Sequence, residues 1–172
     1  MKDLDIILTR ESQREYENTK IKQEDINLLM QCAMSGPSCL NLRDYAFIIV
    51  DDKKKLNEIS DLIGPSAKPL KNASLAIVVL MDESRAYEKA KDYRIIDSTI
   101  AAQNIMLAAN ALNIGSVMLG IYPQMDRVNK LNEYFNLPNY ISTNSIISLG
   151  YKKNKTNGKN HYEEDRIHYN KW

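Results

Sequence analysis

The residues best suited to hold a small anionic group stand near the start of the chain. Arg10, Ser12 and Arg14 place two guanidinium groups and a hydroxyl within five residues. Forked guanidinium donors and hydroxyls are suited to clustered phosphate oxygens. The spacing therefore indicates a phosphate site, although a solvated charged turn has the same composition.

A second set of suitable residues, Pro37, Ser38, Cys39 and Asn41, forms a loop between a predicted helix and a predicted strand. Its small side chains would let a flat ligand approach backbone donors, and the amide of Asn41 can both donate and accept hydrogen bonds. A loop that only connects a helix to a strand would have a similar composition. The sequence near Cys39 supplies no base, so we do not predict a nucleophilic thiol.

Two further stretches could face a ligand. Gly120 lies between Leu119 and Ile121 in an apolar run, and a glycine inside a strand marks either a close backbone approach or simple packing. Lys159 and His161 bring basic groups to a polar stretch, where lone histidines are also common surface residues. No triad and no cluster with metal-ligand spacing occurs, so we name no catalytic residue and no metal site.

The composition excludes several classes of protein. The chain has 172 residues with 23 Lys plus Arg against 22 Asp plus Glu, and a net charge of +1 gives no electrostatic case for nucleic-acid binding. The longest apolar runs, such as residues 75–81, are too short to span a bilayer. Two cysteines and no recognisable secretion signal fit a cytoplasmic location.

The hydrophobic pattern predicts one α+β domain over residues 1–172. Residues 92–113 are apolar nearly all round and should form a buried central helix, whereas residues 75–81 should form a strand covered on both faces. Residues 9–20, the segment with Pro65 and Pro69, and the polar stretch 152–160 are expected to be loops. The other predicted helices cover about 1–8, 24–34, 53–63 and 125–134, and the other strands 45–50, 117–121 and 141–149.

The order of these motifs along almost the whole chain resembles the nitroreductase family. The motifs are Arg-x-Ser-x-Arg, Pro-Ser-x-x-Asn before a strand, an Ala-rich helix ending in Asn-Ile-Gly-Ser-Val-Met-Leu-Gly-Ile-Tyr-Pro, Leu-Gly-Tyr, and a closing Arg-Ile-His-Tyr-Asn-Lys-Trp. The resemblance implies a three-layer sandwich, with a mixed, mostly antiparallel sheet between helices. It also implies an intertwined homodimer with one FMN in each of two interfacial clefts. Residues 151–172 would then be an extended arm exchanged onto the partner protomer.

The resemblance also implies roles for the candidate residues. Arg10, Ser12 and Arg14 match residues that hold the FMN phosphate and ribityl chain, and Lys159 and His161 fall where a Lys-x-Arg pair usually completes that site. The loop residues Pro37, Ser38, Cys39 and Asn41 match those that reach the isoalloxazine ring of the partner's flavin. Leu119, Gly120 and Ile121 match a segment whose backbone faces that ring. Arg43, Asp44 and Tyr45 stand where Gln-Pro-Trp is usual, so the acceptor side of the pocket departs from the family pattern.

The activity that the resemblance implies is an FMN-dependent oxidoreductase working by a ping-pong mechanism. NADH or NADPH would reduce the flavin, which would then reduce a small acceptor such as a nitro compound, a quinone or a flavin. Because hydride enters and leaves at the cofactor, no side-chain base or nucleophile is required. The alternatives are an FMN store or sensor without turnover, a relative with different flavin chemistry such as a dehydrogenase or dehalogenase, and a dimer that has lost its cofactor.

Overall fold

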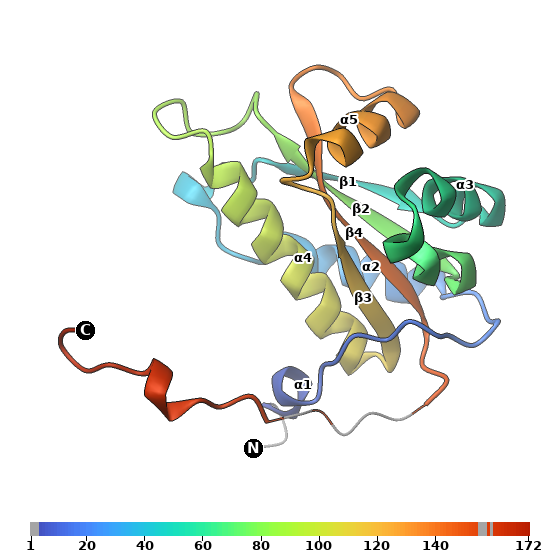
Figure 1. The fold of residues 1–172 in the computed structure, drawn as a ribbon, viewed down its shortest axis with the longest axis horizontal. Coiled ribbons are helices and arrows are strands. Elements are labelled where there is room, and N and C mark those ends of the chain that lie inside the picture. The colour runs from blue at the N-terminus through green and yellow to red at the C-terminus, as the bar shows by residue number, and fades with distance from the viewer. Residues whose placement is uncertain (1–3, 155–157, 159) are drawn as a thin grey trace.

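The structure, a computed structural model, describes residues 4–154, 158 and 160–172, and its centre is a four-stranded sheet (Figure 1). The strands are β1 (Tyr45–Val50), β2 (Leu75–Asp82), β3 (Ile114–Gly120) and β4 (Ile141–Tyr151), in the spatial order β1-β2-β4-β3. All neighbouring pairs are antiparallel. Among the described residues the one parallel pairing is an isolated bridge between Ser12 and Ser116, so the sheet proper is antiparallel rather than mixed.

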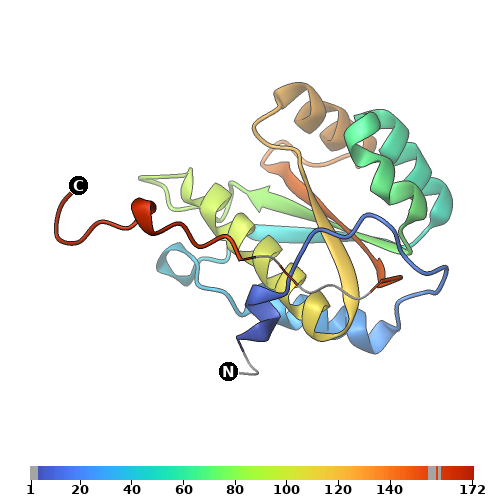
Figure 2. The same cartoon turned by 60° about the horizontal axis from the view of Figure 1, so that its bottom comes forward.

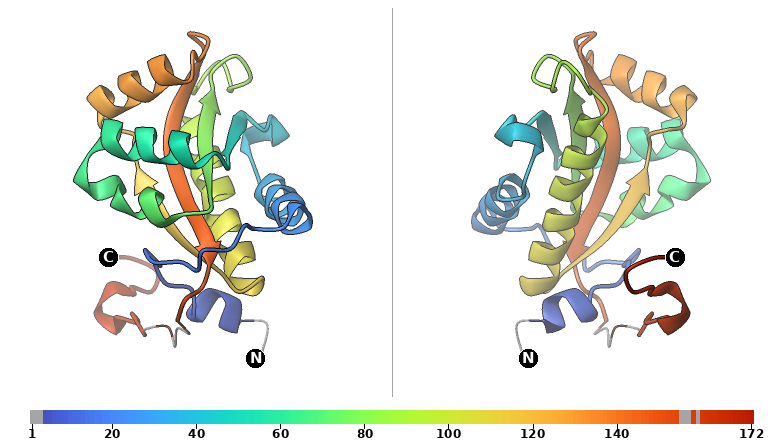
Figure 3. Two further views of the ribbon diagram at one scale, coloured as in Figure 1. Left: turned by 90° about the vertical axis from the view of Figure 1, so that its right-hand side faces the viewer. Right: turned by 90° about the vertical axis from the view of Figure 1, so that its left-hand side faces the viewer.

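Helices cover both faces of the sheet, which confirms the predicted three layers (Figure 3). On one face lie α2 (Gln23–Met34) and α4 (Tyr93–Ala111), and on the other lie α3 (Lys53–Ile63) and α5 (Met125–Tyr134). Along β2, Ile77 and Val79 join the core under α2 and α4, whereas the alternate residues Ala76 and Val78 join the core under α3 and α5. This alternation between two buried faces explains why the strand is apolar without interruption.

The central helix α4 connects two regions that the sequence singled out. Its residues Ala102, Ile105 and Ala109 are completely buried against the sheet and α2. Near its C-terminal end, the side chain of Asn110 donates a 2.8 Å hydrogen bond to the carbonyl of Ile6 in the short helix α1 (Asp5–Leu8). Near its N-terminal end, Asp97 binds the loop that contains Cys39. The two regions therefore lie along one rigid element.

Each predicted helix and strand has a counterpart in the described residues, with ends that shift by a few residues, and residues 1–3 of the first predicted helix lie outside the described part of the chain. One segment has a different secondary structure from the prediction. The residues around Pro65 and Pro69 form a 3₁₀ helix, η2 (Pro65–Asn72), rather than an irregular loop. Proline suits its first position because the first amides of a helix need no partner within it.

No helix in the described residues is long and apolar enough to cross a membrane.

The C-terminal residues leave the body of the chain. Residues 160–172, which we call the tail, extend away from the sheet and contain only the short 3₁₀ helix η3 (Glu164–Arg166) (Figures 1 and 2). The largest apolar side chains of the tail are exposed, among them Tyr169 at 84% and Trp172 at 99%. Such exposure is unusual for aromatic side chains in a chain that acts alone.

Candidate functional site

Residues 9–16, which we call the strap, carry the first group of candidate ligands. They lie across the N-terminal end of β3. The backbone amide of Gln13 donates a 2.9 Å hydrogen bond to the carbonyl of Ser116. At the far end of the strap, the phenolic oxygen of Tyr16 lies 2.8 Å from the Gln13 carbonyl and 3.0 Å from Ser148 Oγ. Burial raises the pKa of Tyr16 to about 12, so this phenol stays a neutral donor. The strap is thus a fixed platform for Arg10, Ser12 and Arg14.

Two glycines that are paired on the neighbouring strands β3 and β4 leave room for the strap. Gly115 on β3 pairs with Gly150 on β4. A Cβ atom at Gly115 would lie 2.9 Å from Gln13 Cβ, and one at Gly150 would lie 2.5 Å from Tyr16 Cβ. Both glycines are therefore required by the close approach of the Gln13 and Tyr16 side chains of the strap and not by turn formation.

We expect Gly150→Ala to lower the free energy of unfolding by about 1–3 kcal/mol, the usual range for forcing an extra carbon into a packed site. The new methyl group must displace Tyr16, so FMN binding should weaken as well. Urea denaturation followed by circular dichroism checks the first effect. Gly120→Ala is the matched control for stability, because a Cβ at Gly120 would meet nothing within 4 Å. Equal stability of the two variants would contradict this account of the strap.

An open cavity of about 760 Å³ brings Arg10 together with residues from the far end of the sequence. Its lining includes Thr9 and Arg10 from the strap and Gly158, Asn160 and His161 from the C-terminal segment. The structure thus places Arg10 and His161 in the lining of one cavity. Lys159 lies outside the described residues, although both of its neighbours line this cavity.

Arg14 faces a different cavity, of about 370 Å³, between the strap and η2. The lining of this second cavity includes Arg14 and Glu15 from the strap and Pro65, Lys68 and Pro69 from η2. Neither Arg14 nor Lys68 forms an ion pair with another residue that the structure describes. The strap therefore separates its two arginines into neighbouring cavities instead of clustering them. Lys68 was missed by the sequence analysis, because a single lysine between two prolines carries no recognisable signal.

The third group of candidates lies where β3 ends. The side chains of Leu119 and Ile121 are 8% and 0% exposed and belong to the core under α3 and α5. Gly120 between them is exposed, with open space where a side chain would stand. Only the backbone of this segment can therefore face a ligand, and Gly120 provides the accessible surface.

The loop of Pro37 to Arg43 is held in an uncommon conformation. It contains the short 3₁₀ helix η1 (Cys39–Asn41), and Leu40, Asn41 and Arg43 have φ values of 49°, 57° and 52°. Such left-handed backbone is costly for residues other than glycine and is often found at functional sites. Two hydrogen bonds oppose this cost: Cys39 N donates to Asp97 Oδ2 at 2.7 Å, and Arg43 N donates to Ser38 Oγ at 3.0 Å.

The thiol of Cys39 is poorly placed for nucleophilic chemistry. Burial raises its pKa, and the nearby charges of Asp97 and Asp44 raise it further. A thiolate is therefore disfavoured at this position, in agreement with the absence of a base in the sequence. Within the described part of the chain, no group of three or more His, Cys, Asp or Glu residues could hold a metal ion.

One chain does not bring all the candidate residues together. The loop contacts α4 at Asp97, whereas α1, directly before the strap, contacts α4 at Asn110. Thirteen residues of helix separate these two positions, which corresponds to about 20 Å. The loop of Pro37 to Asn41 and the cavity of Arg10 therefore lie at opposite ends of α4 in the same protomer.

Comparison with known proteins gives consistent matches over the whole chain. Residues 7–71 and 64–151 match the profile of the nitroreductase family. A protein of Archaeoglobus fulgidus, provisionally named NADH dehydrogenase/NAD(P)H nitroreductase, is 38% identical and covers 98% of each sequence. The crystal structure of a protein with the same provisional name from Parabacteroides distasonis has a TM-score of 0.93 at 33% identity and covers 100% of this chain and 99% of that one. An FMN-dependent nitroreductase of Clostridium difficile R20291 has a TM-score of 0.89 at 29% identity, over 98% of this chain and 99% of that one.

Proposed function

The chain belongs to the nitroreductase family, and on that basis we propose that it is an FMN-dependent oxidoreductase that takes electrons from NADH or NADPH. The observation that carries the proposal is the arrangement of basic side chains on and beside the strap, in two cavities that also contain the acids Asp5 and Glu15. Arg10 and His161 line one cavity, and Arg14 and Lys68 line the next. An elongated ligand with a phosphate at one end and an electron-accepting ring at the other fits this pattern.

The residues present are suited to FMN. Arg10, Ser12, His161 and Lys159 would hold the phosphate, because charge-assisted hydrogen bonds to phosphate oxygens are the strong ones. Arg14 and Lys68 would lie beside the ring, where positive charge favours the negative charge gained on reduction. Gly120 would leave room for the ring to approach the backbone. Bound FMN would supply the hydride chemistry, so the side chains need only bind, orient and exclude water.

We further propose that the site is completed in a homodimer. Because the Pro37 to Asn41 loop lies about 20 Å from the cavity of Arg10 in its own chain, only a second copy could bring such a loop to that cavity. A symmetric pair would do so twice, giving two equivalent sites. Exposed apolar residues on α4, such as Ile96 at 54%, support a face covered by a partner.

The tail would be the exchanged arm. A cavity of about 500 Å³ beside the edge strand β1 has the apolar side chains of Met34, Tyr45 and Phe47 and the two cations Arg43 and Arg85 in its lining. The tail carries exposed aromatic side chains and three consecutive acidic residues, 163–165. Apolar surface and opposite charge make the partner's tail a suitable occupant of this cavity.

The acceptor is proposed to be a small oxidised molecule, such as a nitro compound, a quinone or a free flavin, that replaces the oxidised nicotinamide in a ping-pong cycle. Arg43 is the last residue of the loop expected to face that acceptor, and Asp44 and Tyr45 follow it directly. Because they differ from the usual Gln-Pro-Trp, these residues are where we expect acceptor preference to differ from that of relatives.

A visible spectrum of the purified protein tests the proposal directly. We expect about one FMN per protomer, and loss of the flavin absorbance when NADH or NADPH is added without oxygen. A nitroaromatic or a quinone should then restore the absorbance. Protein that takes up no FMN would contradict the cofactor assignment. Bound flavin that neither nucleotide reduces would favour the store or sensor, and reduced flavin that no such acceptor reoxidises would favour a divergent chemistry.

A further inference from the structure

Asp44 is a buried acid with no hydrogen-bond donor to satisfy it. It directly precedes β1, its exposed fraction is 0%, and neither of its carboxyl oxygens accepts a hydrogen bond from an N–H or hydroxyl group of the described residues. An ionised carboxylate in this position would be costly, since burial removes water and nothing replaces it.

A second buried acid faces Asp44 from the central helix. Asp97 on α4 is 3% exposed, and its Oδ2 accepts the 2.7 Å hydrogen bond from Cys39 N. Burial first, then the charge of Asp97 and a hydrogen bond between the two carboxyl groups, raise the pKa of Asp44 to about 6. A protonated Asp44 carboxyl can donate a hydrogen bond to Asp97, whose Oδ2 at the same time accepts from the Cys39 amide of the loop.

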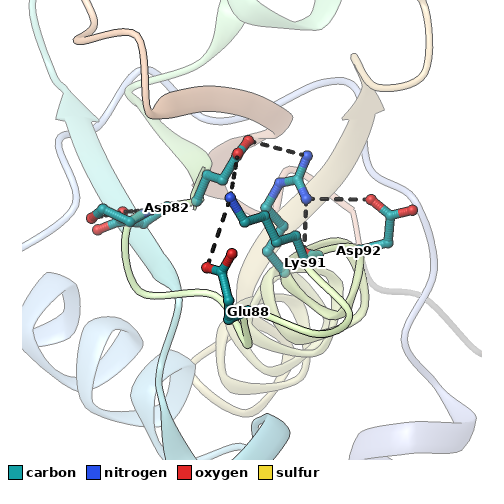
Figure 4. Close-up of polar contacts among 7 residues, drawn as sticks. Asp82, Glu88, Lys91 and Asp92 are labelled. Carbon is teal, nitrogen blue, oxygen red and sulfur yellow. Dashed lines mark hydrogen bonds and ion pairs between the residues drawn. The ribbon is translucent and has the colours of Figure 1, made fainter.

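The other charged groups around Asp44 do not replace this proton. Arg94 on α4 lowers the pKa of Asp44, but its guanidinium already binds Glu83 at 3.7 Å and Asp92 at 3.3 Å, within the ion-pair network between β2 and α4 (Figure 4). Arg43 donates its Nε–H to Asn41. Cys39 and Tyr45 both have raised pKa values and are neutral near pH 7. The charge of Arg85 lowers the pKa of Tyr45 and offsets part of that rise. Asp82 on β2 contacts Asp44 through the backbone: its amide donates a 2.9 Å hydrogen bond to the backbone carbonyl of Asp44.

We propose that Asp44 and Asp97 hold one proton between them, and that this shared proton positions the loop of Ser38 to Arg43. The inference rests on the proposed function, in which this loop meets the partner's FMN. Asp44 is then a positioning residue, because it acts on the flavin through Asp97 and the Cys39 amide. When the proton is lost, two adjacent buried anions repel, and the bond that opposes the strain of Leu40 and Asn41 weakens.

The sign of the pH effect follows from the raised pKa of Asp44. The folded chain keeps a proton on this carboxyl that the unfolded chain releases at lower pH, so the contribution of the pair to folding falls as pH rises from about 4 to above 6. We expect the loop to be held most firmly at the acid end of this range. FMN affinity should follow the same direction.

Asp44→Asn tests the proposal, because an amide keeps the shape of the protonated acid and cannot ionise. We expect FMN to bind wild type more weakly than Asp44→Asn at pH 8, by roughly tenfold or more, and equally well at pH 5. The FMN phosphate also titrates near pH 6, so the ratio of the two dissociation constants at each pH is the quantity to compare. Asp51→Asn, an exposed change just after β1, should behave as wild type at every pH.

Carboxyl-carbon and amide NMR of the whole protein give a reading that does not depend on FMN. One aspartate carboxyl should titrate near pH 6, with the Cys39 amide shifting at the same midpoint, and both transitions should vanish in Asp44→Asn. Should that variant not fold, Asp97→Asn serves instead and should return Asp44 towards its ordinary pKa. An Asp44 that titrates near 4 in wild type, or a Cys39 amide that ignores the transition, would overturn the proposal. Absence of FMN binding with these transitions present would overturn only the proposed function.

Discussion

Arg10→Ala is expected to raise the dissociation constant for FMN by roughly ten- to a hundredfold. Arg10 lines the cavity of about 760 Å³ together with His161, and a hydrogen bond to a charged group is worth roughly 1.5–3 kcal/mol. The second cation that the family usually places near the phosphate is the weaker base His161 in this chain, so more of the binding should depend on Arg10. An equilibrium titration of the flavin fluorescence measures the change.

Two further variants identify the cause of the loss. Arg10→Lys keeps the charge without the fork-shaped donors, so its affinity should lie between those of wild type and Arg10→Ala. Arg127→Ala on α5 removes an arginine that lines none of the cavities described above and should bind FMN as wild type does. An unchanged affinity of Arg10→Ala would show that the phosphate binds elsewhere.

The fold could be predicted from the sequence where the hydrophobic pattern is local. The buried central helix and the strand covered on both faces are both present, because each is specified by the periodicity of its own residues. The strand order β1-β2-β4-β3 could not be derived this way, since pairings between β2 and β4 join residues about seventy positions apart. Resemblance to a family supplied the three-layer arrangement that local patterns leave open.

The site could be predicted less completely, for reasons that the geometry explains. Arg10 and His161 meet in one cavity although about 150 residues separate them, and only the family pattern linked them. The position of Lys68 beside Arg14 depends on where η2 lies. The sequence predicted an irregular loop there because of its two prolines. Asp44 and Asp97 were not recognised as a pair, because an acid is expected on the surface and nothing in the sequence places two elements face to face.

Three large apolar side chains of the tail are exposed in the single chain, and the proposed exchange of arms would cover them. Ile167, Tyr169 and Trp172 are 43%, 84% and 99% exposed. Burying one large apolar side chain completely is worth roughly 1.5–3 kcal/mol. In a symmetric dimer with exchanged arms each contact occurs twice, so these side chains should contribute a large part of the association energy.

Replacing Ile167, Tyr169 and Trp172 together by serine should therefore convert the proposed dimer to a monomer. The variant leaves Gly158, Asn160 and His161, which line the cavity of Arg10, unchanged. Light scattering should report a mass near 19.7 kDa instead of twice that value. FMN should be lost as well, because the loop of Pro37 to Asn41 then no longer reaches the flavin from a partner. Tyr140→Ser, at a side chain 47% exposed between α5 and β4, is the control and should stay dimeric with FMN bound. A triple variant that remains a dimer would show that the tail is not the exchanged arm.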